Sequence, residues 1–134
     1  MKTNKGLIIM LIISLCLFGM TACNGEKPNE TIQYEQINAE KAKEIMDNET
    51  DYIIVDARTQ EEFDEGHIEG AILIPEYEIT DRAEKELPDK DQLILVYCRS
   101  GRRSKIASET LVNLGYTNVK EFGGIIDWPY ETVK

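Results

Sequence analysis

Two short apolar runs constrain the fold of this chain most. "YIIVDA" (Tyr52–Ala57) and "QLILVYC" (Gln92–Cys98) are apolar at nearly every position and show little alternation with polar residues. A strand with this pattern is buried on both faces, which is typical of a parallel sheet covered by helices. Because parallel strands need long crossover connections, helices are expected between them.

The segments around these two strands alternate between strand and helix patterns. Asn38 is expected to cap a helix whose apolar stripe is Ala42, Ile45 and Met46. The last helix is expected to turn Ile106, Ala107, Thr110, Leu111 and Leu114 toward the core, with Gly115 just beyond its end. The pattern predicts an α/β domain with a mainly parallel central sheet of about five strands and helices on both faces. Further strands are expected at 31–37, 71–75 and 119–122, and further helices around Phe63, over 76–87 and over 104–114.

The first 22 residues have the pattern of an export signal. Lys2 and Lys5 precede a run, Leu7–Phe18, that is apolar except for Ser14 and is short for a ~30 Å hydrocarbon core. The following "MTAC" resembles the lipobox of bacterial lipoprotein signal peptides, which implies that Cys23 is lipidated. An uncleaved N-terminal anchor is the alternative. We expect a signal peptide at 1–22, a polar tether at 23–31 and a domain at 32–134, exported and lipid-anchored on the extracytoplasmic face of a bacterial membrane.

Cysteine content and charge narrow the function further. Of the three cysteines, Cys16 would leave with the signal and Cys23 would carry lipid, so Cys98 has no partner for a disulfide. A lone thiol in an exported protein indicates a reactive group rather than a structural one. The formal net charge of −10 argues against nucleic acid as a partner. The sequence has no cluster of His and Cys, so no metal site is expected.

The stretch "CRSGRR" (Cys98–Arg103) carries the candidate chemistry. It lies between a buried strand and a helix, and it holds three of the five arginines of the chain. Gly101 permits a left-handed turn, in which successive backbone N–H groups can converge on an anion. The helix start adds further N–H groups. Such surroundings lower the pKa of a thiol, so Cys98 is the candidate nucleophile.

Spacing within the loop separates two kinds of anion chemistry. Tyrosine-phosphatase-type enzymes combine a strand, a cysteine loop and a helix, with arginine six positions after the cysteine. That position here is Ser104, and the arginine comes one residue earlier, at Arg103. The shorter loop suits a single added sulfur atom better than a phosphoryl group. A phosphatase or arsenate reductase therefore remains the less favoured alternative.

Four segments in the same order resemble those of rhodanese-like domains of the single-domain sulfurtransferase type. They are "IIVDART", "EEFDEGHIEGAILIP", "VYCRSGRRS" and "GGIIDW", and the resemblance runs from about Ile32 to Tyr130. One departure is Leu73, where the family often has Asn. The resemblance implies the rhodanese fold and a sulfurtransferase that moves a sulfane sulfur from thiosulfate or a related donor to a thiol or cyanide.

The resemblance also implies roles for individual residues. Cys98 would carry the sulfur as a persulfide, without a metal or organic cofactor. Arg102 and Arg103 would bind the anionic donor, Arg99 would lie more peripherally, and Ser100 and Gly101 would supply N–H groups. Asp56, Arg58 and Ser104 are expected to support the site, the first two as a structural ion pair. In the family, the histidine at His67 is structural, and we expect Trp128 to pack in the core or at its rim.

The sequence leaves a second kind of role open. A redox-sensing, persulfide-sensing or binding module would modify Cys98 with little turnover, although binding modules of this family usually lack the cysteine. The expected partners are a small anionic sulfur donor, a thiol or cyanide acceptor and the membrane reached through the lipid. The domain is expected to be a monomer. Since no second cysteine is available to resolve a persulfide, the acceptor is expected to be external.

Overall fold

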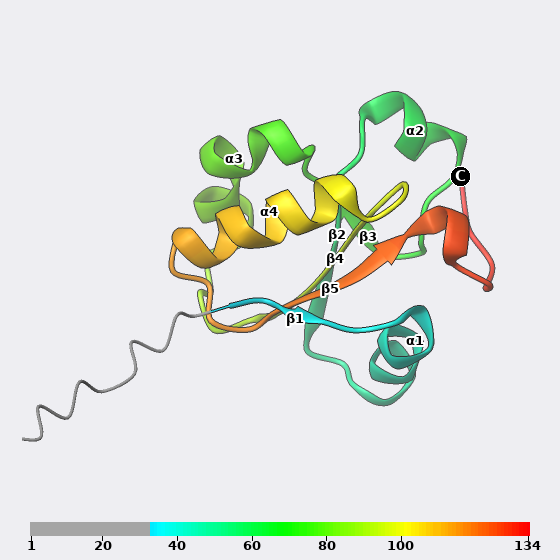
Figure 1. The fold of residues 1–134 in the computed structure, drawn as a ribbon, viewed down its shortest axis with the longest axis horizontal. Helices are drawn as coiled ribbons and strands as arrows, with labels where there is room; N and C mark the ends of the chain where they lie inside the picture. The colour runs from blue at the N-terminus through cyan, green and yellow to red at the C-terminus, as the bar shows by residue number, and fades with distance from the viewer. Residues whose placement is uncertain (1–32) are drawn as a thin grey trace, which may run out of the picture. The chain divides into compact units, whose positions relative to one another are not determined.

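The computed structural model describes residues 33–134 and shows a five-stranded sheet with helices on both faces. All four strand pairs are parallel, and the strand order is β1-β5-β4-β2-β3. The two long apolar strands, β2 and β4, are neighbours inside the sheet (Figure 1). This confirms the predicted α/β fold. The strands are β1 (Glu35–Gln36), β2 (Tyr52–Asp56), β3 (Ala71–Leu73), β4 (Leu93–Cys98) and β5 (Val119–Gly124).

Two apolar clusters hold the helices against the sheet. On one face, α3 and α4 bury Ala83 and Leu111 against Val55 and Val96 of the central strands. On the other face, α1 contributes Ala42 and Ile45 to a second cluster, which includes the fully buried Leu95 of β4. Figure 1 shows α4 and α3 on one side of the sheet, α1 on the other, and α2 beyond the carboxyl ends of the strands. The helices are α1 (Ala39–Asn48), α2 (Gln60–Glu65), α3 (Ile79–Glu86) and α4 (Arg102–Asn113), with short 3-10 turns at Glu76–Glu78 and Ile125–Asp127.

Side chains at the helix ends explain where the helices start. The side chain of Asn38 accepts a hydrogen bond from the Lys41 N–H at 2.8 Å, as predicted for the α1 cap. Thr59 and Glu62 form a capping box at the start of α2, in which each side chain accepts from the other residue's N–H. Gly115 follows α4 with a φ of 96°, the left-handed conformation typical of a residue just beyond a helix.

The structure corrects some details of the predicted elements. α4 begins at Arg102 instead of Ser104, because Gly101 turns the chain directly into the helix. Ile106 was expected in the core but is 40% exposed, since its neighbour Ala107 is the residue that faces the sheet. Strand β1 has only two residues, at the sheet edge, where one neighbour supplies all its pairing.

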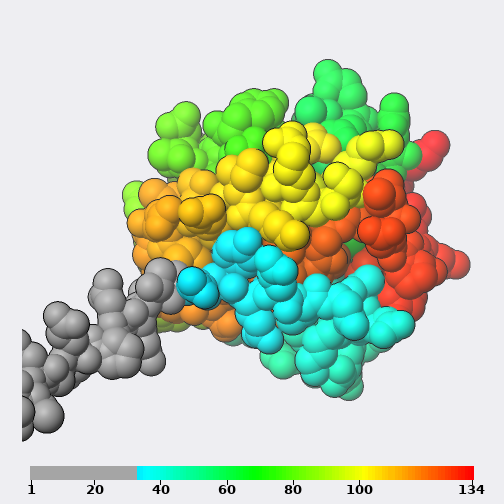
Figure 2. Space-filling model, in the orientation of Figure 1, coloured from blue at the N-terminus to red at the C-terminus, as the bar shows by residue number. Residues whose placement is uncertain are grey.

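The predicted signal, tether and lipidation at Cys23 lie outside the described residues and stay predictions. Within residues 33–134, no helix is long and apolar enough to cross a membrane. In Figure 2, the yellow surface of the Cys98 loop and the start of α4 lies between green α2–α3 and the orange to red residues after β5. The carboxyl edge of the sheet therefore reaches the surface at the loop with the candidate nucleophile.

Candidate active site

Cys98 is the last residue of the most deeply buried strand, β4. The chain then turns through Arg99, Ser100 and Gly101 and enters α4 at Arg102. Gly101 has φ 99° and ψ −13°, a left-handed conformation that other residues rarely adopt. This turn directs the Gly101 N–H toward the Cys98 Sγ, at 3.0 Å. The predicted left-handed turn at Gly101 is therefore present, and it brings a backbone N–H group to the sulfur atom.

Hydrogen bonds prepare the thiol for ionisation. Burial of Cys98, which is 1% exposed, raises its pKa. The side chain of Ser104 and the N–H groups of Ser104, Gly101 and Ser100 outweigh burial, so the pKa lies below its ordinary value. The sequence predicted a lowered pKa from both amides and arginines. The amides and the Ser104 hydroxyl account for most of it.

Ser104 connects Cys98 to the core of the protein. Its Oγ lies 3.3 Å from the Cys98 Sγ and donates to the Glu121 carboxylate at 2.6 Å. Ser104 is fully buried and lies in the first turn of α4, so its hydroxyl is held in place. The structure thus places Ser104, which was expected to support the site, in contact with the candidate nucleophile Cys98.

The loop rests on the end of β5. The Arg99 carbonyl accepts a hydrogen bond from the Ile126 N–H at 3.2 Å. A Cβ atom at Gly124 would lie only 2.1 Å from that carbonyl oxygen and 2.5 Å from the Cα of Ser100. The close approach explains the need for glycine at position 124, because any side chain there would push the loop away.

The three arginines of the loop have different surroundings. Arg99 and Arg102 are exposed. Arg103 makes a two-pronged ion pair with Glu62 of α2, with N–O distances of 2.7 and 2.8 Å. The hydrogen bond to Glu62 is the largest cause of the raised Arg103 pKa, and the charge of Cys98 is a smaller one. Arg103 therefore joins α2 to the start of α4, while Arg99 and Arg102 form no ion pair within residues 33–134.

Asp56 and Arg58 form a buried cluster beside the loop. Both oxygens of Asp56 accept hydrogen bonds from Arg58, and one also accepts from the Tyr97 hydroxyl at 2.5 Å. Arg58 also donates to the Gly66 carbonyl at 2.7 Å, and the Tyr97 oxygen accepts from the Ile68 N–H at 3.1 Å. These bonds link β2, β4 and the end of α2, in accord with the predicted structural ion pair.

His67 is held by contacts of its own turn. Its Nδ1 lies 2.9 Å from the Phe63 carbonyl oxygen, and its ring stacks on the Phe63 ring at 3.7 Å. Its backbone N–H and C=O both bond to Val133 at 2.8 Å. These contacts fit the structural role that the resemblance implied.

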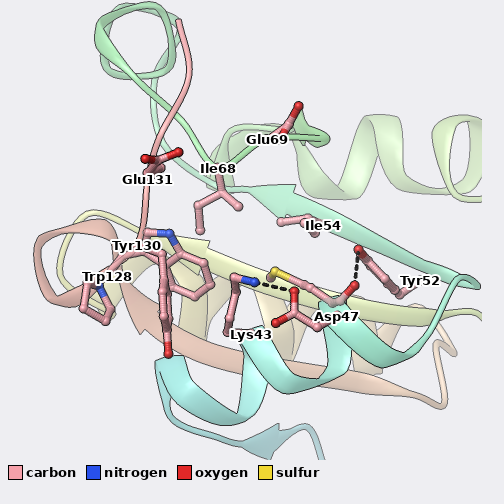
Figure 3. A pocket seen from close by; sticks show the side chains of 11 residues that line it. Lys43, Asp47, Tyr52, Ile54, Ile68, Glu69, Trp128, Tyr130 and Glu131 are labelled. Carbon is pink, nitrogen blue, oxygen red and sulfur yellow. Dashed lines mark hydrogen bonds and ion pairs between the residues drawn. The ribbon is translucent and has the colours of Figure 1, made fainter.

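A separate cavity of about 560 Å³ lies between α1, the start of β2 and residues 128–131. Figure 3 shows Lys43 beside Tyr130 and paired with Asp47, and no residue of the Cys98 loop lines this space. Trp128 lines the cavity and packs against Phe122, as expected of a residue at the rim of the core.

Among residues 33–134, no group of three or more His, Cys, Asp or Glu could hold a metal ion.

Comparison with known proteins identifies the family. A family model described as the rhodanese-like domain matches residues 38–129, which include the whole site. The chain belongs to the rhodanese-like family. Solved structures agree: a rhodanese with anions from E. coli is 38% identical and has a TM-score of 0.59. That match covers 62% of this chain and 98% of the E. coli chain.

Relatives of this rhodanese-like protein include named sulfurtransferases. It is 40% identical over 80 residues to the thiosulfate sulfurtransferase PspE of Escherichia coli, covering 60% of this chain and 77% of PspE. It is 32% identical to the thiosulfate sulfurtransferase GlpE of Coxiella burnetii, covering 72% of this chain and 89% of GlpE. Some other relatives are longer, and the chain spans only 52% of one and 21% of another. The relatives support a rhodanese-type sulfurtransferase.

Two acidic residues that contact this rhodanese-like site, Glu121 and Glu62, were not predicted from the sequence. Glu121 is a buried acid in β5, and its spacing of two from Val119, which puts both on one face of the strand, was the available signal. Glu62 lies within the segment "EEFDEGHIEGAILIP", but no sequence rule pairs it with Arg103, 41 residues away. Glu62 lies in α2 and Glu121 in β5, both far from the Cys98 loop in sequence, so only the tertiary structure brings them to it.

Proposed function

We propose that this protein is a sulfurtransferase in which Cys98 accepts a sulfane sulfur from an anionic donor such as thiosulfate. The observation that carries the proposal is the geometry at Cys98: a buried thiol with a lowered pKa, facing N–H groups of a left-handed loop turn. The similarity to relatives named thiosulfate sulfurtransferases supports it.

The proposed reaction has two covalent steps. The Cys98 thiolate attacks the outer sulfur of thiosulfate, forming a new S–S bond, and the S–S bond of the donor breaks with its electron pair leaving on sulfite. A thiol, as its thiolate, or cyanide then attacks the outer sulfur of the persulfide, and Cys98 leaves as a thiolate. Such a sequence predicts ping-pong kinetics. It needs no metal or organic cofactor, and the loop N–H groups stabilise the anionic sulfur in both steps.

The exposed side chains of Arg99 and Arg102 are the groups we assign to capture of the donor. Arg103 contributes through the field of its guanidinium while it stays paired with Glu62. Ser100 and Gly101 supply N–H groups. Ser104 occupies the position where a phosphatase loop would have arginine, and its hydroxyl contacts the Cys98 sulfur instead. This contact favours sulfur transfer over phosphoryl transfer.

Intact mass measurement of the full chain tests this function directly. Incubation with thiosulfate should add about 32 Da, the mass of one sulfur atom, to the protein. Cyanide should remove the added mass and yield thiocyanate, and Cys98→Ser should gain nothing. If thiosulfate, polysulfide and thiol persulfides all leave the mass unchanged, the proposal is wrong, and phosphate esters and arsenate become the next substrates to test. Sulfur uptake without turnover by a second thiol would indicate a sensing module.

We also propose that the domain is exported, carries lipid on Cys23 and acts as a monomer. The support is the basic start, the short apolar run and the "MTAC" sequence before Cys23. In a bacterial host, the wild-type protein should label with a radioactive fatty acid and sediment with membranes. Cys23→Ser should lose the label. A label that persists in that variant would overturn the lipidation.

A further inference from the structure

Behind the nucleophile, the site contains a buried carboxylate that the sulfur-transfer steps do not use. Glu121 of strand β5 carries a carboxylate, yet the residue is only 2% exposed. Its Oε1 accepts hydrogen bonds from the Ser104 hydroxyl at 2.6 Å and from the Gly123 N–H at 2.8 Å. Within residues 33–134, no lysine or arginine forms an ion pair with it. An unpaired buried carboxylate is costly, so its presence beside a nucleophile calls for a role.

The Ser104 hydroxyl lies between the Cys98 sulfur and the Glu121 carboxylate, and either group can accept its proton when negatively charged. Its Oγ lies 3.3 Å from the Cys98 Sγ and 2.6 Å from the Glu121 Oε1, with the Gly101 and Gly123 carbonyl oxygens at 3.0 and 3.3 Å. A hydroxyl group has one proton to donate and can accept another. While Cys98 is a thiol, its S–H donates to Ser104 and Ser104 donates to the carboxylate. The three groups then form one continuous chain of hydrogen bonds.

Ionisation of Cys98 alone would place two negative charges close together. The two hydrogen-bond lengths put the Cys98 Sγ and the Glu121 Oε1 within about 6 Å of each other. Both groups are buried, where like charges repel strongly, and the proposed donor adds further negative charge. If the proton that leaves the sulfur stays inside the site, the total charge stays at minus one and this repulsion is avoided.

We propose that Glu121 takes up the proton of Cys98 through Ser104 when the thiolate forms. The Cys98 S–H bond breaks and its proton bonds to the Ser104 Oγ. The original Ser104 O–H bond breaks and its proton bonds to the Glu121 Oε1. The Ser104 hydroxyl now donates to the thiolate, and the charge of the three groups is minus one before and after. The inference rests on the proposed function, and Glu121 is in it a positioning residue that acts through Ser104.

Other charged groups near β5 do not replace Glu121 in this role. Arg103 of α4 forms an ion pair with Glu62 of α2, and this pair lowers the Glu62 pKa to about 2. Lys120 of β5 pairs with Glu35 of β1. Arg99 and Arg102 in the Cys98 loop are exposed, and Asp56 is bound by Arg58 and Tyr97. Among these groups, Glu121 alone has a hydrogen-bonded path to the sulfur through Ser104.

The rate at which Cys98 is alkylated by iodoacetamide, measured against pH on the full chain, tests the proposal. A lone thiol gives one ionisation step, with about a tenfold rise in rate per pH unit below its pKa. Two coupled groups sharing one proton give two steps, separated by a plateau in which part of the protein is thiolate. We expect the wild type to show this plateau and Glu121→Gln to show a single step, since the amide cannot take up the proton. Glu109→Gln removes an exposed acid from α4 and should keep the plateau.

Two further variants keep the test decisive if Glu121→Gln does not fold. Ser104→Ala removes the hydroxyl that donates to the thiolate, so the form with a thiolate and a protonated Glu121 should lose population and the plateau should fall. Infrared spectra of the wild type at neutral pH should show the C=O stretch of a carboxylic acid, and Cys98→Ser should lose it because its hydroxyl does not ionise. A single step in the wild type, or a Glu121→Gln profile moved along the pH axis without a change of shape, would overturn the proposal. Alkylation needs no sulfur donor, so failure of sulfur uptake in the mass experiment would contradict only the proposed function.

Discussion

At the scale of single residues, two adjacent glycines after Glu121 are required for different reasons. Gly123 has a φ of 90°, so its backbone conformation is the constraint, and a Cβ atom there would meet nothing within 4 Å. Gly124 has φ −127° and ψ 154°, which any residue adopts, but it has no room for a Cβ atom. The first glycine shapes the chain and the second lets the Cys98 loop rest on it.

Gly124→Ala should therefore abolish most sulfur transfer. The added methyl group would overlap the Arg99 carbonyl, and relief of the overlap moves the loop N–H groups away from Cys98. We expect kcat/KM for thiosulfate to fall by about a hundredfold or more and the free energy of unfolding to fall by about 1–3 kcal/mol. Enzyme kinetics and urea unfolding measure the two effects.

Gly115→Ala is the matched control for this variant. Position 115 also has a positive φ but open space around it, so alanine there should cost about 1–2 kcal/mol of stability and leave kcat/KM unchanged. If both variants lose activity in proportion to stability, the close packing at Gly124 has no special effect on the loop.

At the scale of secondary structure elements, the pair Glu62–Arg103 fastens α2 to the start of α4. The bond to Arg103 is the largest cause that lowers the Glu62 pKa from 4.5 to about 2. Because the pKa is lower in the folded protein, the pair stabilises the fold fully above about pH 4.5, and this stabilisation is lost as the pH falls toward about 2. Glu62→Gln keeps the capping box, so its loss of stability reports the pair.

We expect Glu62→Gln to lower the free energy of unfolding by about 1–2 kcal/mol at pH 7, since the partly exposed pair is screened by solvent. The difference from the wild type should shrink below about pH 4.5 and vanish near pH 2. Urea unfolding at several pH values measures it. Glu61→Gln removes an exposed charge from the same helix and should change stability little. A difference that is constant with pH would mean that the charge of Glu62 is not what stabilises α2.

The cluster of Asp56, Arg58 and Tyr97 joins three elements and should matter for stability more than for chemistry. Tyr97→Phe removes the hydroxyl that donates to Asp56 and leaves the Ile68 N–H unsatisfied. The expected cost is about 1–3 kcal/mol of the free energy of unfolding, with kcat per folded molecule unchanged. Denaturant unfolding and kinetics on the same preparation measure both. A fall in kcat larger than the folded fraction explains would give the cluster a direct part in catalysis.

The elements were more predictable from the sequence than their contacts. The apolar runs of β2 and β4 and the cap at Asn38 are local patterns, and the structure confirms them. The exposure of Ile106 was not predictable from apolar residues alone, because the buried face of α4 runs through Ala107 and Leu111 with Ser104 and Ser108 beside them. For the site, Cys98 and its loop follow from local sequence, whereas Glu62 and Glu121 reach it only through the packing of α2 and β5.

At the scale of the whole molecule, a strongly acidic chain is proposed to attract an anion. The formal net charge is −10, while the exposed Arg99 and Arg102, in the loop after Cys98 and at the start of α4, add positive charge locally. The two fields differ in range. The Debye length is about 30 Å at 10 mM salt and about 8 Å at 150 mM, so distant acidic residues act on the donor only at low salt. The nearby arginines act at both.

The rate of sulfur uptake should therefore rise with salt, whereas capture of an anion by arginines alone would weaken with salt. Raising ionic strength from about 10 to about 150 mM should increase kcat/KM for thiosulfate about two- to fivefold, because long-range repulsion is screened before the contact with the arginines. Arg102→Gln should lower kcat/KM at every ionic strength, and Lys105→Gln, one exposed charge further along α4, should have a small effect. A kcat/KM that falls with salt in the wild type would mean that the local arginines outweigh the acidic surface even at long range.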